Sequence, residues 1–138
     1  MNTTPAPLVF QDPLQNPENK MFWDSAQQRK LLLKHCKACD ITHYYPRPYC
    51  PHCGSEQTEW QTSSGIGEVY SFTRMVRGVE TPFVMAYIRL DDGVTVLSHL
   101  QTDDWDAVQI GMRVKVHFVP SASGQNVPVF VPDGFATT

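Results

Sequence analysis

Four cysteines constrain this 138-residue chain more than any other feature of its sequence. They form two Cys-x-x-Cys units separated by ten residues: Cys36, Cys39, Cys50 and Cys53. A tight turn lets the two thiolates of one unit converge on a metal ion, and the second unit completes a tetrahedral shell. Gly54 follows the second unit, where the turn needs a residue that tolerates positive φ. The pattern predicts a zinc ribbon over residues 36–60.

The same ligand set indicates what the metal does. Four thiolates leave a zinc ion no open coordination position, so we expect a structural rather than a catalytic metal. Iron is an alternative occupant of these ligands. A redox function for one Cys-x-x-Cys pair is a further alternative, but it leaves the other pair unexplained. Three nearby histidines are redundant as ligands, and we expect them to face solvent: His35, His43 and His52.

Charge and hydropathy exclude two classes of partner. The chain has 11 basic and 14 acidic residues, a formal charge of −3, which argues against a general binder of nucleic acid or of anionic membranes. No apolar run approaches the roughly 20 residues of a membrane span. The first residues, 1–11, lack the charged and apolar regions of a signal peptide. We therefore expect a cytoplasmic protein with no membrane segment.

Three segments are predicted, with boundaries at 1–35, 36–60 and 61–138. In the first, residues 17–35 favour one or two short helices, although Leu31–Leu33 could instead form the strand that enters the ribbon. Phe22 and Trp23 are adjacent and cannot share one face of a helix. We expect one of these two rings to be exposed or to contact a partner.

The third segment has the pattern of a small barrel. Five runs alternate around β-forming residues, at 66–73, 83–90, 94–100, 114–119 and 127–131. Asp91-Asp92-Gly93 is a strong hairpin signal between the second and third runs. Residues 102–108 predict a short helix with Thr102 or Asp103 as its N-cap. Five strands with one small helix between the third and fourth predict a mainly β protein with an OB-fold barrel.

OB-folds commonly bind single strands of nucleic acid on a basic face with stacking aromatic rings. Four aromatic residues of the barrel occupy alternate strand positions, where we expect core packing, although they could form a stacking platform: Tyr70, Phe72, Phe83 and Tyr87. Residues 61–138 contain five basic and eight acidic residues. The acidic balance argues against nucleic acid as the ligand of this barrel.

No catalytic motif emerges from the sequence. The chain has no Gly-x-Ser-x-Gly elbow, no phosphate-binding P-loop and no His-Glu-x-x-His metal site. Ser98 and His99 are adjacent on a predicted strand and point to opposite faces, which disfavours a Ser–His dyad. We expect His117 to be structural, and Asp91 and Asp92 to serve the turn.

Taken together, these motifs resemble a known family. The order runs Phe22-Trp23, then Leu31 to Cys39 and Tyr45 to Ser55 around the cysteines, then Gly65 to Thr73, Asp91 to Val94, Ile110 to Val114 and Pro128 to Phe130. Over about residues 18–132, this is similar to the OB-fold acyl-CoA-associated family with an N-terminal rubredoxin-like zinc ribbon. By this resemblance, the four cysteines of the present chain match the zinc ligands of that family one for one.

The resemblance implies a non-catalytic accessory subunit of an acyl-CoA thiolase or thiolase-like aldolase, which stabilises the partner and helps to enclose acyl-CoA. A partner subunit of an enoyl-CoA hydratase is the alternative within the same family. A nucleic-acid-binding module is the alternative from another class. Three arginines are candidates for contact with CoA phosphates, Arg47 at the ribbon tip and Arg74 and Arg77 in the first barrel loop. Phe22 and Trp23 are candidates for the partner interface.

Charge depletion agrees with such a role. Only 18% of the residues are charged, against roughly 25% in an average globular protein. Interfaces are depleted in charged residues and enriched in aromatic ones. We expect the helices and the ribbon to dock on a thiolase-type partner while the barrel covers the CoA entrance.

Overall fold

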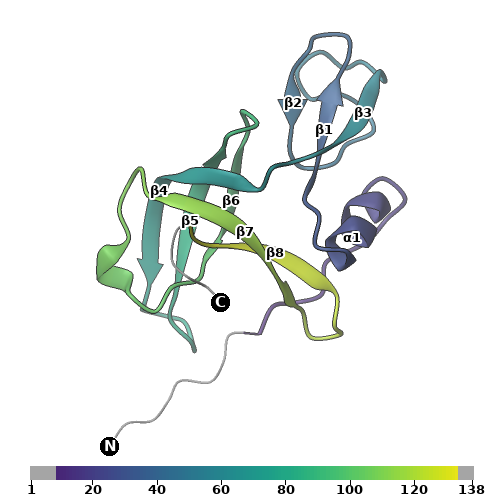
Figure 1. The fold of residues 1–138 in the computed structure, drawn as a ribbon. Coiled ribbons are helices and arrows are strands. Elements are labelled where there is room, and N and C mark those ends of the chain that lie inside the picture. The colour runs from purple at the N-terminus through teal and green to yellow at the C-terminus, as the bar shows by residue number, and fades with distance from the viewer. Residues whose placement is uncertain (1–8, 134–138) are drawn as a thin grey trace, which may run out of the picture.

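The structure, a computed structural model, describes residues 9–133. Figure 1 shows a three-stranded ribbon at one end, a five-stranded barrel at the other, and a helix beside the ribbon. The elements are α1 (Lys20–Gln27), β1 (Leu32–Cys36), β2 (Thr42–His43), β3 (Thr58–Thr62), β4 (Ile66–Met75), β5 (Phe83–Leu90), β6 (Thr95–Leu100), the 3₁₀ helix η1 (Trp105–Ala107), β7 (Arg113–Pro120) and β8 (Asn126–Pro132). Residues 1–8 and 134–138 of the predicted segments lie outside the described residues, and the three segment boundaries stay predictions.

The ribbon is built around β1, which pairs antiparallel with β2 on one side and with β3 on the other. The strand alternative for Leu31–Leu33 is therefore correct, because β1 begins at Leu32. Strand β2 is two residues long and β3 is five residues long. Such short strands bury little apolar surface by themselves, so the ribbon needs another source of stability.

Helix α1 lies between the ribbon and the barrel, where it contacts β1 and β8. It buries both Phe22 and Trp23, which are 1% and 8% exposed. The expectation that one ring is exposed is wrong, because the two rings pack edge to face with centroids 4.8 Å apart, and both side chains contact Tyr45 of the ribbon. The Phe22 ring lies 5.8 and 5.5 Å from the rings of Tyr44 and Tyr45, and the Trp23 indole N–H donates a 3.2 Å hydrogen bond to the Tyr45 hydroxyl. The backbone carbonyl of Trp23 accepts a hydrogen bond from Gln125, which connects the helix to the barrel.

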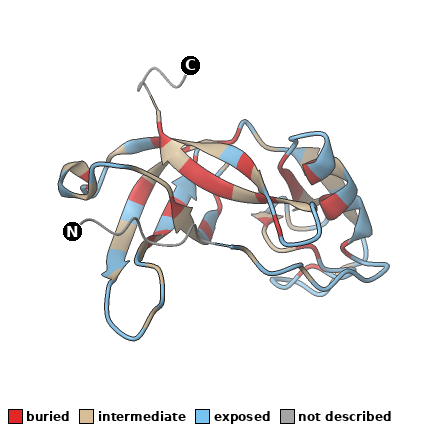
Figure 2. Ribbon diagram, turned by 90° about the horizontal axis from the view of Figure 1, so that it is seen from below, coloured by how far each residue is buried: buried red, intermediate tan, exposed pale blue. Residues whose placement is uncertain are grey.

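The buried apolar residues therefore form one continuous cluster that includes α1, the start of β1 and the barrel. Figure 2 shows buried positions along the barrel strands and also in the part of the chain that holds the helix and ribbon. Since Phe22 and Trp23 belong to this core, neither offers a surface to another protein. We drop both as candidates for a partner interface.

The barrel closes in the order β4-β5-β6-β8-β7, as expected for an OB-fold. Inward residues alternate along β5, where Val84, Ala86, Ile88 and Leu90 are all buried. The predicted hairpin follows, and Leu90 and Val94 close it through a 2.8 Å backbone hydrogen bond. Strands β4 and β5 approach closely at Gly67, where a Cβ atom would lie 2.5 Å from the Arg89 carbonyl oxygen.

The outer face of the barrel differs from the prediction at two tyrosines. A bulge between Val69 and Ser71 turns Tyr70 outward, and its side chain is 53% exposed. Tyr87, opposite Leu97 of β6, is 48% exposed. The expectation of core packing is wrong for both tyrosines: Tyr70 lies in the bulge of β4, and Tyr87 takes an outward position of β5 between the inward residues Ala86 and Ile88.

Between β6 and β7 the helix is shorter than predicted, since η1 spans three residues. Asp104, not Thr102 or Asp103, occupies the N-cap position, and its side chain makes no capping hydrogen bond. The Thr102 hydroxyl instead accepts a 3.2 Å hydrogen bond from the Asp104 N–H. Such local bonds compete with helix formation and account for the shortened element.

Candidate metal centre

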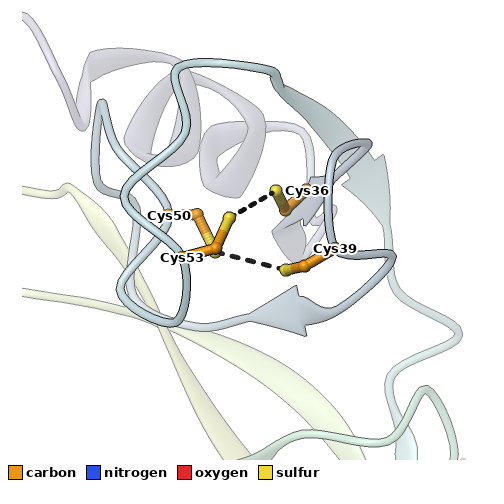
Figure 3. A group of neighbouring side chains, drawn as sticks. All are labelled: Cys36, Cys39, Cys50 and Cys53. Atoms are coloured by element: carbon orange, nitrogen blue, oxygen red, sulfur yellow. Dashed lines mark hydrogen bonds between the residues drawn. The ribbon is translucent and has the colours of Figure 1, made fainter.

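The four cysteine sulfurs converge at one end of the ribbon, as Figure 3 shows. All four Sγ atoms lie within 4.8 Å of one another. Two of the separations are 3.6 Å, between Cys36 and Cys53, and 3.7 Å, between Cys39 and Cys50. A tetrahedral ion with metal–sulfur bonds of about 2.3 Å places its ligands about 3.8 Å apart. The residues present therefore fit a metal ion bound by four thiolates.

Two turns with the same hydrogen bonds hold these ligands. In the first, the Cys36 N–H donates to Ile41 and the Asp40 N–H donates back to Cys36, both at 2.9 Å. In the second, the Cys50 N–H donates to Ser55 at 2.9 Å and the Gly54 N–H donates to Cys50 at 2.8 Å.

Each turn places the residue after its second cysteine in the left-handed region, Asp40 at φ 60° and Gly54 at φ 77°. The requirement at Gly54 is confirmed. Sequence reasoning missed the equivalent position at Asp40, although aspartate is one of the few residues that tolerate this conformation.

The thiols do not titrate alike in this cluster. Burial and hydrogen bonds with the other three thiols raise the pKa of Cys39 to about 12. Burial also opposes ionisation of Cys50, but backbone N–H groups of Cys53 and His52 outweigh it and lower the pKa of Cys50 to about 6. The His52 N–H lies 3.3 Å from the Cys50 sulfur. A bound divalent cation compensates the charge and allows all four thiols to ionise.

The histidines near the cysteines have three different environments. His35 is hydrogen bonded, with its ring nitrogens 2.9 Å from the Thr42 hydroxyl and 2.8 Å from an Asp40 carboxylate oxygen. His43 is 3% exposed, and its burial lowers its pKa. Of the three histidines, His52 is the one on the surface. The prediction of solvent-facing rings is therefore wrong for His43, which the short strand β2 turns into the interior.

The three arginine candidates lie at separate places. Arg47 and Arg77 are exposed, the first between two ribbon prolines and the second in the loop that follows β4. Arg74 lies on β4 rather than in that loop, which corrects its predicted position. Its guanidinium donates a 2.7 Å hydrogen bond to the Trp105 carbonyl and lies 3.9 Å from Asp106. Arg74 is thus already engaged within the chain.

The adjacent Ser98 and His99 do not form a dyad in the structure. The Ser98 hydroxyl donates to the Pro128 carbonyl at 3.4 Å, rather than to His99. The cysteine cluster is the one group of three or more metal-binding side chains found in this range. No helix in the described part of the chain is long and apolar enough to span a membrane.

Two family models match consecutive parts of the chain. The model of the rubredoxin-like zinc ribbon domain of ChsH2 matches residues 23–59, which include all four cysteines. The model of the C-terminal OB-fold domain of ChsH2 matches residues 60–119. The two matches meet within β3, the last strand of the ribbon, six residues before the first barrel strand begins at Ile66.

Curated relatives carry related names. A DUF35 domain-containing scaffold protein of Pyrococcus furiosus is 33% identical over 69% of this chain and 74% of its own length. A probable enoyl-CoA hydratase alpha subunit of Thermomonospora curvata is 32% identical over 87% of this chain, but this chain spans only 39% of that relative. The benzoylsuccinyl-CoA thiolase subunit BbsA of Geobacter metallireducens is 28% identical over 68% of this chain and 66% of its own length.

A solved structure supports the same relationship over the whole fold. A chain of the "Ltp2-ChsH2(DUF35) aldolase" superposes with a TM-score of 0.75 and 31% identity, covering 88% of this chain and 98% of that one. The order of ribbon and barrel, the four cysteines and these matches agree. The chain belongs to the ChsH2/DUF35 family of proteins with a rubredoxin-like zinc ribbon and an OB-fold.

Proposed function

We propose that this protein is a non-catalytic accessory subunit of an acyl-CoA thiolase or thiolase-like aldolase complex, in which it stabilises the partner and helps to enclose acyl-CoA. One observation carries the proposal. The chain covers 98% of a DUF35 chain whose structure is described as an aldolase with Ltp2. The name of BbsA, a thiolase subunit, supports the same class of partner.

The metal centre supports a structural role within that complex. We propose Zn²⁺ as the ion, held by Cys36, Cys39, Cys50 and Cys53, because four thiolates in this arrangement fill a tetrahedral zinc shell. A filled shell has no position for substrate. Four cysteines without a disulfide also suit the reducing cytoplasm, where we propose that the protein acts.

We assign the partner to the outer face of β4–β6, in place of the helix and ribbon expected from the sequence, because the helix rings are buried. Three exposed side chains from adjacent strands form an outer apolar row: Tyr70, Tyr87 and Leu97. Tyr87 lies directly opposite Leu97, and the bulge at Tyr70 lies next to the Ser71–Tyr87 pair. The Arg89 guanidinium covers the Tyr70 ring at 4.5 Å. An aromatic and aliphatic surface with one arginine has the composition of an interface core.

A hydratase partner is the second candidate, and one relationship favours it. The relative named as an enoyl-CoA hydratase alpha subunit matches 87% of this chain. Both candidates process CoA thioesters, and Arg47 and Arg77 stay proposed CoA contacts in either complex. A nucleic-acid partner is disfavoured by the acidic excess in residues 61–138.

Affinity capture of the full chain from its native host tests the proposal. We expect a stoichiometric acyl-CoA enzyme of the thiolase or aldolase type, identified by mass spectrometry, that stays bound after nuclease treatment. Recovery of a hydratase would favour the second candidate. A free monomer, or nucleic acid that dissociates steeply with salt, would contradict the proposed function.

A further inference from the structure

A cleft of about 610 Å³ lies where the turn after α1 meets the barrel. Figure 1 shows α1 beside β8 in this part of the molecule. The walls come from the helix turn, the segment after β6, and strands β7 and β8. Its polar lining residues are Arg29, Gln101, Lys115 and His117. No carboxylate of the described residues lines this cleft.

The two barrel residues project from the same side of β7. Lys115 and His117 are two positions apart and pair with Val131 and Val129 of β8. Alternate residues of a strand share a face, so both side chains lie on the face away from inward-pointing Val114 and Phe118. His117 is exposed there, contrary to the structural role predicted for it.

These basic groups have no counter-charge within the described chain. Other arginines of the barrel are engaged, Arg113 with Asp91 at 2.6 Å and Arg74 with the Trp105 carbonyl. Across residues 9–133, no hydrogen bond or ion pair is formed by the side chains of Arg29, Lys115 or His117. In a barrel with an acidic excess, an uncompensated basic cleft is a site for an anion.

The backbone at Arg29 gives an independent reason to expect a ligand. The Lys30 N–H donates to Ser25 and the Arg29 N–H donates to Ala26, which together form the C-terminal cap of α1. The cap places Arg29 at φ 61°, where helices usually carry glycine. Arginine has no side-chain hydrogen bond that would favour this conformation. The strain is understandable if the guanidinium is needed in the cleft.

We propose that this cleft binds the phosphate groups of coenzyme A, with Arg29 and Lys115 as the charged contacts and His117 as a hydrogen-bond donor. The assignment of CoA rests on the proposed function, because the relatives' names refer to CoA thioesters. Phosphate contacts of this kind are made by arginine as a fork and by lysine as a point charge. CoA carries a diphosphate and a 3′-phosphate, and these negative charges match a cleft lined by several basic side chains.

Calorimetric titration of the metal-loaded full chain tests the site. We expect CoA and inorganic diphosphate to bind and pantetheine, which has no phosphate, not to bind. ATP, another nucleotide that carries phosphate groups, is titrated in the same way, and we expect CoA to bind more tightly than ATP. Lys115→Met removes one charged contact and should weaken CoA binding about tenfold or more. Lys20→Met removes the same charge from the exposed Lys20–Asp24 pair on α1 and should leave CoA affinity unchanged.

Arg29→Gly separates binding from folding. Glycine relieves the left-handed strain, so the variant should unfold at a higher temperature and yet bind CoA about tenfold more weakly. A residue that only caps the helix would give the stability gain without the loss of affinity.

Three results would overturn the site. They are unchanged CoA affinity in Lys115→Met and Arg29→Gly, binding of pantetheine as tight as that of CoA, and tighter binding of a single-stranded oligonucleotide than of CoA. Partner capture by the same variants keeps the two proposals distinct. Normal capture with unaltered CoA affinity refutes the cleft alone, whereas CoA binding without any acyl-CoA enzyme refutes the proposed function alone.

Discussion

Removing the metal should unfold the ribbon while the barrel keeps its structure. Structural zinc contributes on the order of 10 kcal/mol to folding, and the ribbon strands bury too little apolar surface to replace it. Hydrogen exchange of the chelated protein should therefore show lost protection in β1–β3 and retained protection in β4–β8. Metal analysis should give one zinc ion per chain before chelation.

Single substitutions of the ligands give the same test without a chelator. Cys50→Ser should lose the metal and unfold the ribbon, because a three-thiolate site binds the ion less tightly. His52→Ala is the matched control, since it alters a surface side chain beside Cys50 and should keep full metal content. Retained hydrogen-exchange protection of β1–β3 in a variant in which all four cysteines are replaced by serine would contradict the structural role of the metal.

A charge in the outer apolar row should abolish assembly without affecting the fold. Leu97 is 51% exposed and Tyr87 is 48% exposed, so glutamate at either position stays in water in the free protein. In the complex the same carboxylate would be buried without a partner. We expect Leu97→Glu and Tyr87→Glu to weaken partner binding at least about 30-fold, as for an interface hot spot.

Ile110→Glu controls for the loss of an exposed aliphatic side chain elsewhere. Ile110 is 70% exposed in the turn before β7, outside the row. Thermal unfolding and zinc content should be the same in all three variants. If Leu97→Glu and Tyr87→Glu assemble as well as Ile110→Glu does, the partner docks elsewhere.

Much of the barrel was predictable because its signals are local. Alternation marks the inward residues of β5, and Asp91-Asp92-Gly93 marks the hairpin that follows it. The metal ligands were equally predictable, since both Cys-x-x-Cys units depend on the same short turns. Short-range patterns of this kind determine their own geometry without reference to the rest of the chain.

What the sequence did not reveal depends on long-range contacts. The burial of Phe22 together with Trp23 requires the ribbon to pack against the helix, with Tyr45 in contact with both side chains, and no local pattern predicts that contact. The exposure of Tyr70 depends on a bulge that alternation cannot predict. The cleft joins Arg29 to Lys115 across 86 positions of sequence, so only the folded chain brings them together.

The accessory role is tested most directly by measuring turnover of a CoA thioester by the captured complex, by its separated subunits and by the recombined mixture. We expect the turnover rate of the partner to fall at least about tenfold when this chain is removed and to recover on recombination, because a subunit that encloses CoA positions the substrate. This chain alone should turn over none. Activity in the isolated chain, or a partner equally active without it, would contradict a non-catalytic subunit that the complex requires.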